Sequence, residues 1–146
     1  MNLTQNFTLG EAMFSSTALR HGIDNAIPES LLGNVKLAAV GMEEVRSLLG
    51  DHRVDVDSWY RCGVLNGVVN GSKTSAHMDG YAVDFVCRAF GTPLEIVRAI
   101  AASGIKFDQC IQEGRWVHIS FDPKMRGRVL TAHFKDGVAT YTEGVA

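Results

Sequence analysis

Residues 75–85 read Ser75-Ala76-His77-Met78-Asp79-Gly80-Tyr81-Ala82-Val83-Asp84-Phe85, and this stretch decides how the chain folds around its polar side chains. The first half is typical of a turn, where Gly80 permits a sharp reversal of the backbone. The apolar run at 81–87 predicts a strand. Such a strand can direct Asp84 back toward His77, which lies seven positions earlier.

A second stretch, Trp116-Val117-His118-Ile119-Ser120, has the period of a strand. Alternation places Trp116, His118 and Ser120 on one face and the two aliphatic side chains on the other. If the two strands pair, His118 comes close to the imidazole and the carboxylate of the first stretch.

Two imidazoles and one carboxylate at the edges of apolar strands are the ligand set of a catalytic zinc site with one open position. We therefore expect His77, Asp84 and His118 to bind one Zn²⁺ per chain. Glu113, close to His118 in the sequence, is placed to accept a proton from water and to pass it to a leaving amine. For each residue alone, a solvated or hydrogen-bonded structural role is the alternative. Taken together, charges within apolar runs favour a metal site, because buried charges are normally paired or bind metal.

Length and charge limit the fold and the partners. We expect one domain over residues 1–146, since a chain of 146 residues can bury roughly two thirds of its unfolded surface. The net charge is −2 and no basic cluster is present, so a nucleic-acid partner is not expected. No apolar run has the length that membrane insertion requires.

The start of the chain and its cysteines bear on the cellular compartment. The first residues lack the basic and apolar regions of a secretory signal, so we expect synthesis in the cytoplasm without a signal peptide. Three widely spaced cysteines, Cys62, Cys87 and Cys110, fit neither a disulfide framework nor a paired metal site. We expect them to be reduced.

The apolar pattern predicts helices in the first part of the chain and strands mostly later. A capping box opens a helix at 8–19, and a proline opens a second one at 28–49. A third helix is expected at 93–102 and a loop at 66–73. The expected strands are 53–57, leading into 58–61; 81–87; and two hairpins, 107–112 with 116–121 and 129–134 with 138–141. This order indicates an α+β fold with N-terminal helices packed on a small, mostly antiparallel sheet.

The two stretches resemble the zinc D-alanyl-D-alanine carboxypeptidases, whose relatives include vancomycin-resistance dipeptidases, phage cell-wall endopeptidases and the hedgehog signalling domain. The family pattern Ser-x-His-x-x-Gly-x-Ala-x-Asp is matched at Ser75, His77, Gly80, Ala82 and Asp84. The later pattern Glu…Trp-x-His is matched at Glu113, Trp116 and His118. The chain is most similar to the compact, single-domain branch found in phages and bacteria, which implies a hedgehog/DD-peptidase-like fold.

The resemblance also implies roles for single residues. His77, Asp84 and His118 would bind zinc, and Glu113 would be the general acid and base. Arg61 would lie in the substrate cleft, where a guanidinium can neutralise an oxyanion or hold a substrate carboxylate; an exposed arginine at a strand end is the alternative. We also expect substrate contacts from Ser75, Tyr60 and Trp116, although Ser75 could instead cap the turn before His77.

The function implied is a zinc peptidase that hydrolyses peptide bonds in bacterial peptidoglycan stem peptides. D-Ala-D-Ala carboxypeptidase and L-Ala-D-Glu endopeptidase activities both fit, because they share the metal site and differ in the cleft walls. We expect a monomer that acts on the cell wall as a phage endolysin released by a pore-forming holin, as a virion-associated enzyme, or as a cytoplasmic recycling enzyme. The alternative from another class is a non-catalytic, zinc-stabilised module that binds cell wall or protein, which would not need Glu113.

Overall fold

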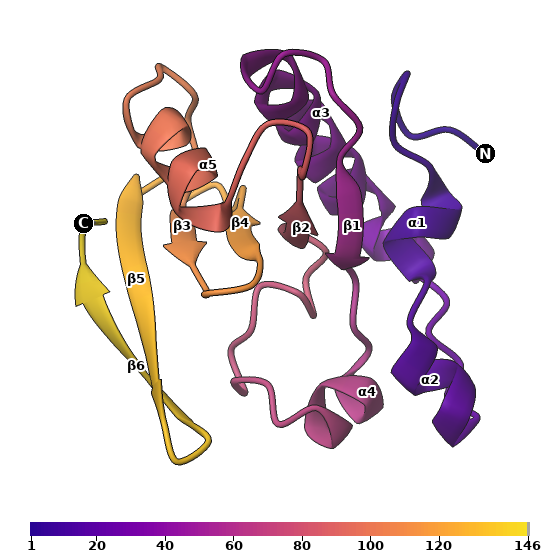
Figure 1. Cartoon of the computed structure of the whole chain (residues 1–146). Helices are drawn as coiled ribbons and strands as arrows, with labels where there is room; N and C mark the ends of the chain where they lie inside the picture. Colours follow the sequence, from indigo (N-terminus) through magenta and orange to yellow (C-terminus); the bar gives the residue numbers. More distant parts are fainter. Residues whose placement is uncertain (146) are drawn as a thin grey trace.

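The computed structural model describes residues 1–145, and its helices lie mostly in the first half of the chain (Figure 1). They are α1 (Leu9–Met13), α2 (Ser16–His21), the 3₁₀ helix η1 (Glu29–Leu31), α3 (Leu32–Leu48), α4 (Gly63–Val68) and α5 (Pro93–Ala101). The strands are β1 (Asp55–Ser58), β2 (Ala82–Val86), β3 (Gln109–Gln112), β4 (Val117–Ser120), β5 (Arg128–Lys135) and β6 (Val138–Glu143). The expected α+β class is confirmed.

The strands form one sheet in the order β1-β2-β4-β3-β5-β6. Every neighbouring pair is antiparallel except β3 and β5, which run parallel. Both expected hairpins are present, as β3 with β4 and as β5 with β6. The sheet is therefore mostly antiparallel, as the sequence predicts.

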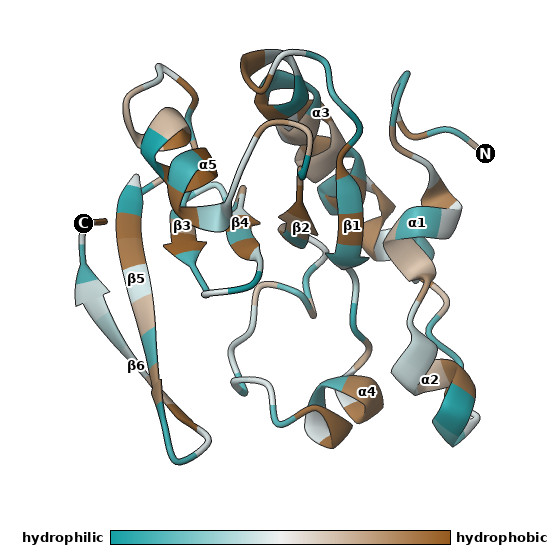
Figure 2. Cartoon of the chain, in the orientation of Figure 1, coloured by the Kyte–Doolittle hydropathy of each residue, from teal (hydrophilic) through white to brown (hydrophobic). Residues whose placement is uncertain are grey.

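The two faces of the sheet have different surroundings. One face carries apolar side chains such as Phe85, Cys110 and Ile119, which join the main core together with residues of α3 and α5. Helix α3 approaches this face closely at Gly41, where a Cβ atom would lie 2.3 Å from the Phe121 ring. The apolar colouring of β2 and β3 in Figure 2 follows this packing. The opposite face carries Asp84 and His118.

The parallel pairing of β3 with β5 requires the chain to cross the beginning of β3 after it leaves β4. Arg126 holds this crossing in place, because its Nε and Nη2 atoms donate to the two carboxylate oxygens of Asp108 at 2.8 and 2.9 Å. The backbone N–H of Arg128 donates to the Asp108 carbonyl at 2.9 Å. Strand β5 is thereby fixed beside β3.

The helix expected at 8–19 is interrupted, so that prediction is wrong in its extent. Thr8 and Glu11 do form the capping box of α1. Phe14 is then extended, and Ser15 caps a new helix by accepting a hydrogen bond from the Ala18 N–H at 3.1 Å. The second N-cap competes with continuation of the first helix.

The loop expected at 66–73 begins later than predicted, because its first residues complete α4. Cys62 caps this helix, with its Sγ atom accepting from the Leu65 N–H at 3.4 Å. The helix expected at 28–49 starts instead with η1, since Pro28 is extended and only η1 and α3 after it are helical. No helix among residues 1–145 is both long and apolar enough to cross a membrane.

Candidate metal centre and active site

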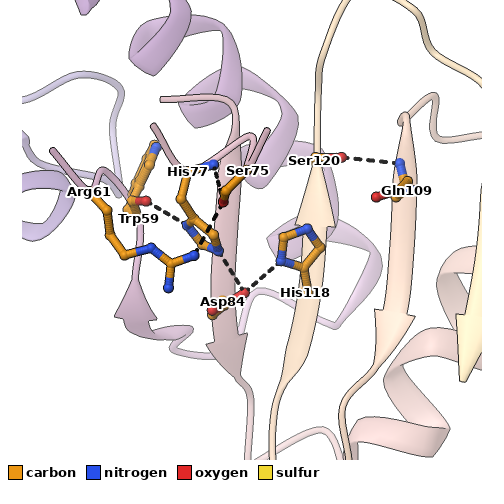
Figure 3. A network of polar contacts seen from close by, with 8 residues as sticks. All are labelled: Trp59, Arg61, Ser75, His77, Asp84, Gln109, His118 and Ser120. Carbon is orange, nitrogen blue, oxygen red and sulfur yellow. Dashed lines mark hydrogen bonds and ion pairs between the residues drawn. The ribbon is translucent and has the colours of Figure 1, made fainter. Parts of the chain in front are cut away.

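Three side chains converge on the uncovered face of the sheet. Asp84 on β2 lies directly opposite His118 on β4, so the two side chains share one face. The Oδ1 atom of Asp84 lies 2.9 Å from Nδ1 of His118 and 3.2 Å from Nε2 of His77. One ligand atom from each residue lies within 4.8 Å of the other two. Figure 3 shows the two imidazoles pointing toward Asp84 from different sides.

His77 reaches this position from the turn that precedes β2. Gly80 in this turn has φ +82°, and a Cβ atom there would lie 2.7 Å from the Cγ2 atom of Val35. A glycine is therefore needed both for the backbone conformation and for the close approach to α3. The predicted reversal at Gly80 is present.

The backbone after β1 orients the His77 ring. Nδ1 of His77 lies 2.6 Å from the carbonyl oxygen of Trp59, which can only accept a hydrogen bond, so Nδ1 carries a proton. The indole of Trp59 is fully buried and donates to the Gly80 carbonyl at 3.1 Å. This arrangement leaves Nε2 of His77 facing Asp84.

The chemistry of these atoms fits a bound cation. Burial is the main cause that lowers the pKa of His77, which favours the neutral ring, while Asp84 opposes the shift. With Nδ1 protonated, Nε2 directs a lone pair at the Asp84 carboxylate, and two acceptors 3.2 Å apart repel unless a cation lies between them. Donors of a tetrahedral zinc site with bonds of about 2.0–2.1 Å lie about 3.3 Å apart, close to the observed separations.

Asp84 is suited to remain ionised in this site. Burial alone would raise its pKa, but positive charge on the His77 and His118 side would lower the pKa well below its ordinary value. With neutral imidazoles, a cation bound between the same atoms would supply that charge. Only 13% of the Asp84 side chain is exposed. A carboxylate that stays charged over the physiological pH range is a suitable metal ligand.

Arg61 lies beside this group at the far side of His77 (Figure 3). Its backbone N–H donates to the His77 carbonyl at 3.1 Å, and Nη2 donates to the Ser75 hydroxyl at 3.2 Å. The Nε–H is buried and has no partner among the described residues. Burial lowers the pKa of Arg61, with Asp84 opposing the shift. A half-buried, incompletely paired guanidinium favours an anionic or carbonyl group of a ligand.

Glu113 follows β3 in the turn that leads to β4. Its N–H donates to the Trp116 carbonyl at 3.0 Å, and Gly114 next to it has φ +85°. Burial raises the pKa of Glu113, a shift that Asp84 reinforces and His118 opposes. A raised pKa makes the protonated form of the carboxyl group more accessible, which suits a residue that has to release a proton as well as accept one.

These groups line one cleft of about 910 Å³, a volume typical of small-ligand sites. Of the residues expected to contact substrate, Ser75 and Trp116 line the cleft together with Arg61. Ser75 also accepts from the His77 N–H at 3.2 Å, so it caps the turn as well. Tyr60 is only 5% exposed and is not part of the cleft wall, so the substrate contact expected of it is not supported.

A sequence profile described as Peptidase M15 matches residues 5–120. The chain belongs to the Peptidase M15 family. Membership indicates a metallopeptidase, and the matched range includes both stretches that supply the cluster of His77, Asp84 and His118. No curated protein matches the chain in a sequence search.

Two structural contributors to this Peptidase M15 site were not anticipated. The Trp59 carbonyl belongs to the backbone, so no pattern of residue types predicts that it orients the His77 ring. Asn25 is buried, donates to the carbonyls of Met13 and Tyr60 at 2.9 Å each, and accepts from the Cys62 N–H at 2.8 Å. It thereby holds the backbone on both sides of Arg61. An isolated asparagine in a polar segment gives no signal for such a role.

Proposed function

We propose that this chain is a zinc-dependent peptidase that hydrolyses peptide bonds in the stem peptides of bacterial peptidoglycan. The observation that carries the proposal is the convergence of three metal-ligand atoms with Glu113 and Arg61 in one cleft. Zinc would act as a Lewis acid in such a site: it polarises a peptide carbonyl and lowers the pKa of water toward about 7. The ligands would be Nε2 of His77, Oδ1 of Asp84 and Nδ1 of His118.

In this proposal Glu113 moves the protons. As a carboxylate it accepts a proton from the attacking water, and as a carboxylic acid it donates that proton to the departing amine. Its raised pKa makes both states accessible, because burial favours the neutral form. A positioned acid and base of this kind contributes roughly 10²- to 10⁴-fold to the rate.

Arg61 stabilises negative charge in the same proposal. Its unpaired Nε–H and the remaining guanidinium donors can bind the oxyanion that develops at the scissile carbonyl. They can equally hold a carboxylate of the substrate in the ground state. Arg61 is fixed on both sides by its backbone bond to His77 and by Ser75, so the guanidinium is oriented before substrate binds.

The stem-peptide substrate rests on the resemblance of the motifs. Stem peptides carry free carboxylates, which the incompletely paired Arg61 guanidinium can bind. Arg126 in the same cleft is already paired with Asp108. D-Ala-D-Ala carboxypeptidase and L-Ala-D-Glu endopeptidase activities both remain consistent with this arrangement. We further propose that the chain acts as a monomer, on the cell wall after release through a holin pore or from a virion.

Mass spectrometry of products released from purified peptidoglycan tests the function. Zinc-loaded protein should release fragments with one type of new terminus, which identifies the cleaved bond. The Glu113→Gln variant and chelated wild-type protein should release none. Intact muropeptides after prolonged incubation with zinc-loaded protein would contradict the substrate class. Equal cleavage by Glu113→Gln would contradict the proposed mechanism.

A further inference from the structure

The face of the sheet that carries the metal-ligand group continues beyond β4 toward the C-terminal hairpin. His118 on β4 lies opposite Ile111 on β3, and Ile111 is the register partner of Leu130 on β5. Directly paired residues share a face, so Asp84, His118, Ile111 and Leu130 form one row across four strands. Leu130 and every second side chain along β5 therefore belong to the same surface as the ligands.

The hairpin adds an apolar wall to this surface. Ile111, Leu130 and Ala132 form a small apolar cluster of their own, separate from the main core. Tyr141 on β6 lies opposite Ala132 and so shares this face, two positions along β5 from Leu130. Since α3 and α5 pack against the other face, this cluster has the cleft beside it.

Phe134 brings the hairpin close to the proposed acid and base. Strand β5 runs past the end of β3, and the Cε2 atom of Phe134 lies 3.9 Å from the place where a Cβ atom on Gly114 would be. Glu113 is the residue directly before this glycine. Phe134 and Tyr141 are 55% and 51% exposed, and both line the cleft. Two large apolar rings thus remain open to solvent beside the reactive groups.

The two sides of the cleft differ in chemistry. The side next to His77 carries the Arg61 guanidinium and the hydroxyl groups of Ser72, Thr74 and Ser75. The side next to His118 carries Ile111, Leu130, Phe134 and Tyr141, with Glu113 beside them and the Asp108–Arg126 ion pair at the start of β3. The nearest ion pair on the hairpin, Arg128 with Glu143, is satisfied internally and does not line the cleft.

Resting on the proposed peptidase function, we propose that hairpin β5–β6 forms a specificity subsite for an uncharged apolar side chain of the substrate peptide. This side chain flanks the scissile bond on the His118 side, while the charged or carbonyl groups of the peptide face Arg61. Burial of the side chain against Leu130, Phe134 and Tyr141 removes apolar surface from water on both partners. A charged side chain packed against these rings would lose hydration, which disfavours it relative to an apolar one.

The hairpin lies outside the residues that the family profile matches. The Peptidase M15 match ends at residue 120, and both strands of the hairpin lie beyond it. The ligand-bearing residues all lie within the match. Selectivity on the His118 side would therefore be set by a segment that the family motifs do not specify.

Competition between matched peptides tests the subsite. Peptides that differ only in leucine, serine or lysine are compared, first at the residue before the cleaved bond and then at the residue after it. Wild-type protein should prefer leucine over lysine at one of these positions by at least about tenfold in kcat/KM, the size of effect that an apolar pocket gives. The Phe134→Ala/Tyr141→Ala double variant should reduce this preference to about twofold or less.

Two control variants test whether the leucine preference depends on the aromatic rings of Phe134 and Tyr141. Val138→Ala changes an exposed apolar residue of the same hairpin, 62% exposed, that does not line the cleft, and it should keep the preference. Tyr141→Phe keeps the ring and should keep the preference too. An unchanged leucine preference in a folded double variant, checked by thermal unfolding, would overturn the subsite but leave the peptidase function in place.

If no peptide is cleaved, a binding measurement tests whether the subsite exists. The Glu113→Gln variant is titrated with the leucine and lysine peptides, and backbone amide shifts are followed by NMR. The leucine peptide should perturb residues 130–141 and bind at least about tenfold more tightly than the lysine peptide. Absence of cleavage with these perturbations would contradict the peptidase function alone. Equal affinity, or no perturbation of the hairpin, would overturn the subsite.

Discussion

The carbonyl oxygen of Trp59 accepts a hydrogen bond from Nδ1 of His77 at 2.6 Å, which fixes the orientation of the metal-facing nitrogen of that imidazole. Trp59 is itself fixed by a hydrogen bond to Gly80 and by an edge-to-face contact with Phe7, with ring centroids 6.2 Å apart. The orientation of one proposed ligand thus depends on packing that reaches the N-terminal segment. The geometry of the proposed metal site is therefore linked to the packing of the N-terminal segment.

Zinc should stabilise the fold, because it removes the repulsion between the acceptor atoms of His77 and Asp84. At a free zinc concentration of 100 times Kd the gain is about 2.7 kcal/mol, or roughly 5–10 °C in Tm for a domain of this size. Thermal unfolding with zinc and with a chelator measures the shift. Asp84→Asn should abolish it, whereas Asp136→Asn at a hairpin tip should not. An equal Tm with and without zinc would refute the metal site.

Glu113→Gln should keep zinc content and Tm near those of wild-type protein but lower kcat by at least about 100-fold, since a positioned acid and base contributes that much. Metal analysis, unfolding and steady-state kinetics on one preparation give the three readouts. Glu44→Gln on the exposed side of α3 is the matched control and should retain full activity. Wild-type turnover in Glu113→Gln would remove this residue from the mechanism.

Arg61→Ala should lower kcat/KM by about 100-fold while zinc content stays unchanged, because a donor to developing negative charge is lost. Arg61→Lys should recover only part of this loss, since an ammonium cannot reproduce the planar fork of donors. Arg53→Ala, at a side chain that is 88% exposed, serves as the control. The role of Arg61 is excluded if all three variants show wild-type kinetics.

The ion pair between Asp108 and Arg126 should make stability depend on pH in the acid range. The hydrogen bonds of Arg126 lower the pKa of Asp108 despite opposing burial. As pH falls, the Asp108 carboxylate therefore takes up a proton in the unfolded state before it does so in the folded state. The stabilisation by the ion pair is complete above the unfolded pKa of about 3.9 and is lost as pH falls through the lowered folded pKa. Urea unfolding from pH 6 to pH 2 should show a shallower decline for Asp108→Asn than for wild-type protein. If the free energy of unfolding declines equally with pH in both proteins, the ion pair does not have the proposed effect on stability.

Gly80→Ala should destabilise the fold by about 1–3 kcal/mol, because a side chain at φ +82° is strained and would meet Val35. The same change should weaken zinc binding by moving the turn that carries His77. Gly33→Ala is the control, since a Cβ atom in α3 at this place has open space and raises helix propensity by up to about 1 kcal/mol. Equal stability of the two variants in urea would show that the turn tolerates a side chain.

The sequence predicted the convergence of His77, Asp84 and His118 because each lies in a short pattern that determines the direction of its side chain. Alternation assigns Asp84 and His118 to strand faces, and the glycine turn brings His77 back toward them. These signals involve neighbours within a few positions. The structure brings the three side chains together, and their metal binding remains for the zinc experiment to test.

The features that sequence reasoning missed depend on contacts between distant segments. The parallel pairing of β3 with β5 is set by the crossing that Asp108 and Arg126 hold, and the two residues lie 18 positions apart. The helix expected at 8–19 breaks because Ser15 supplies a second cap, which propensity alone does not distinguish from continuation. Tyr60 was expected to contact substrate, yet its side chain is buried.

The order of strands in the sheet places reactivity and selectivity on separate pieces of chain. The proposed ligands reside on β2, β4 and the turn before β2, while hairpin β5–β6 attaches to the outer edge of β3. Exchanging this hairpin for another of different side chains would change one wall of the cleft but none of the residues that are proposed to bind the metal. Grafting a new β5–β6 hairpin is thus a route to variants that prefer another substrate and keep the same proposed metal ligands.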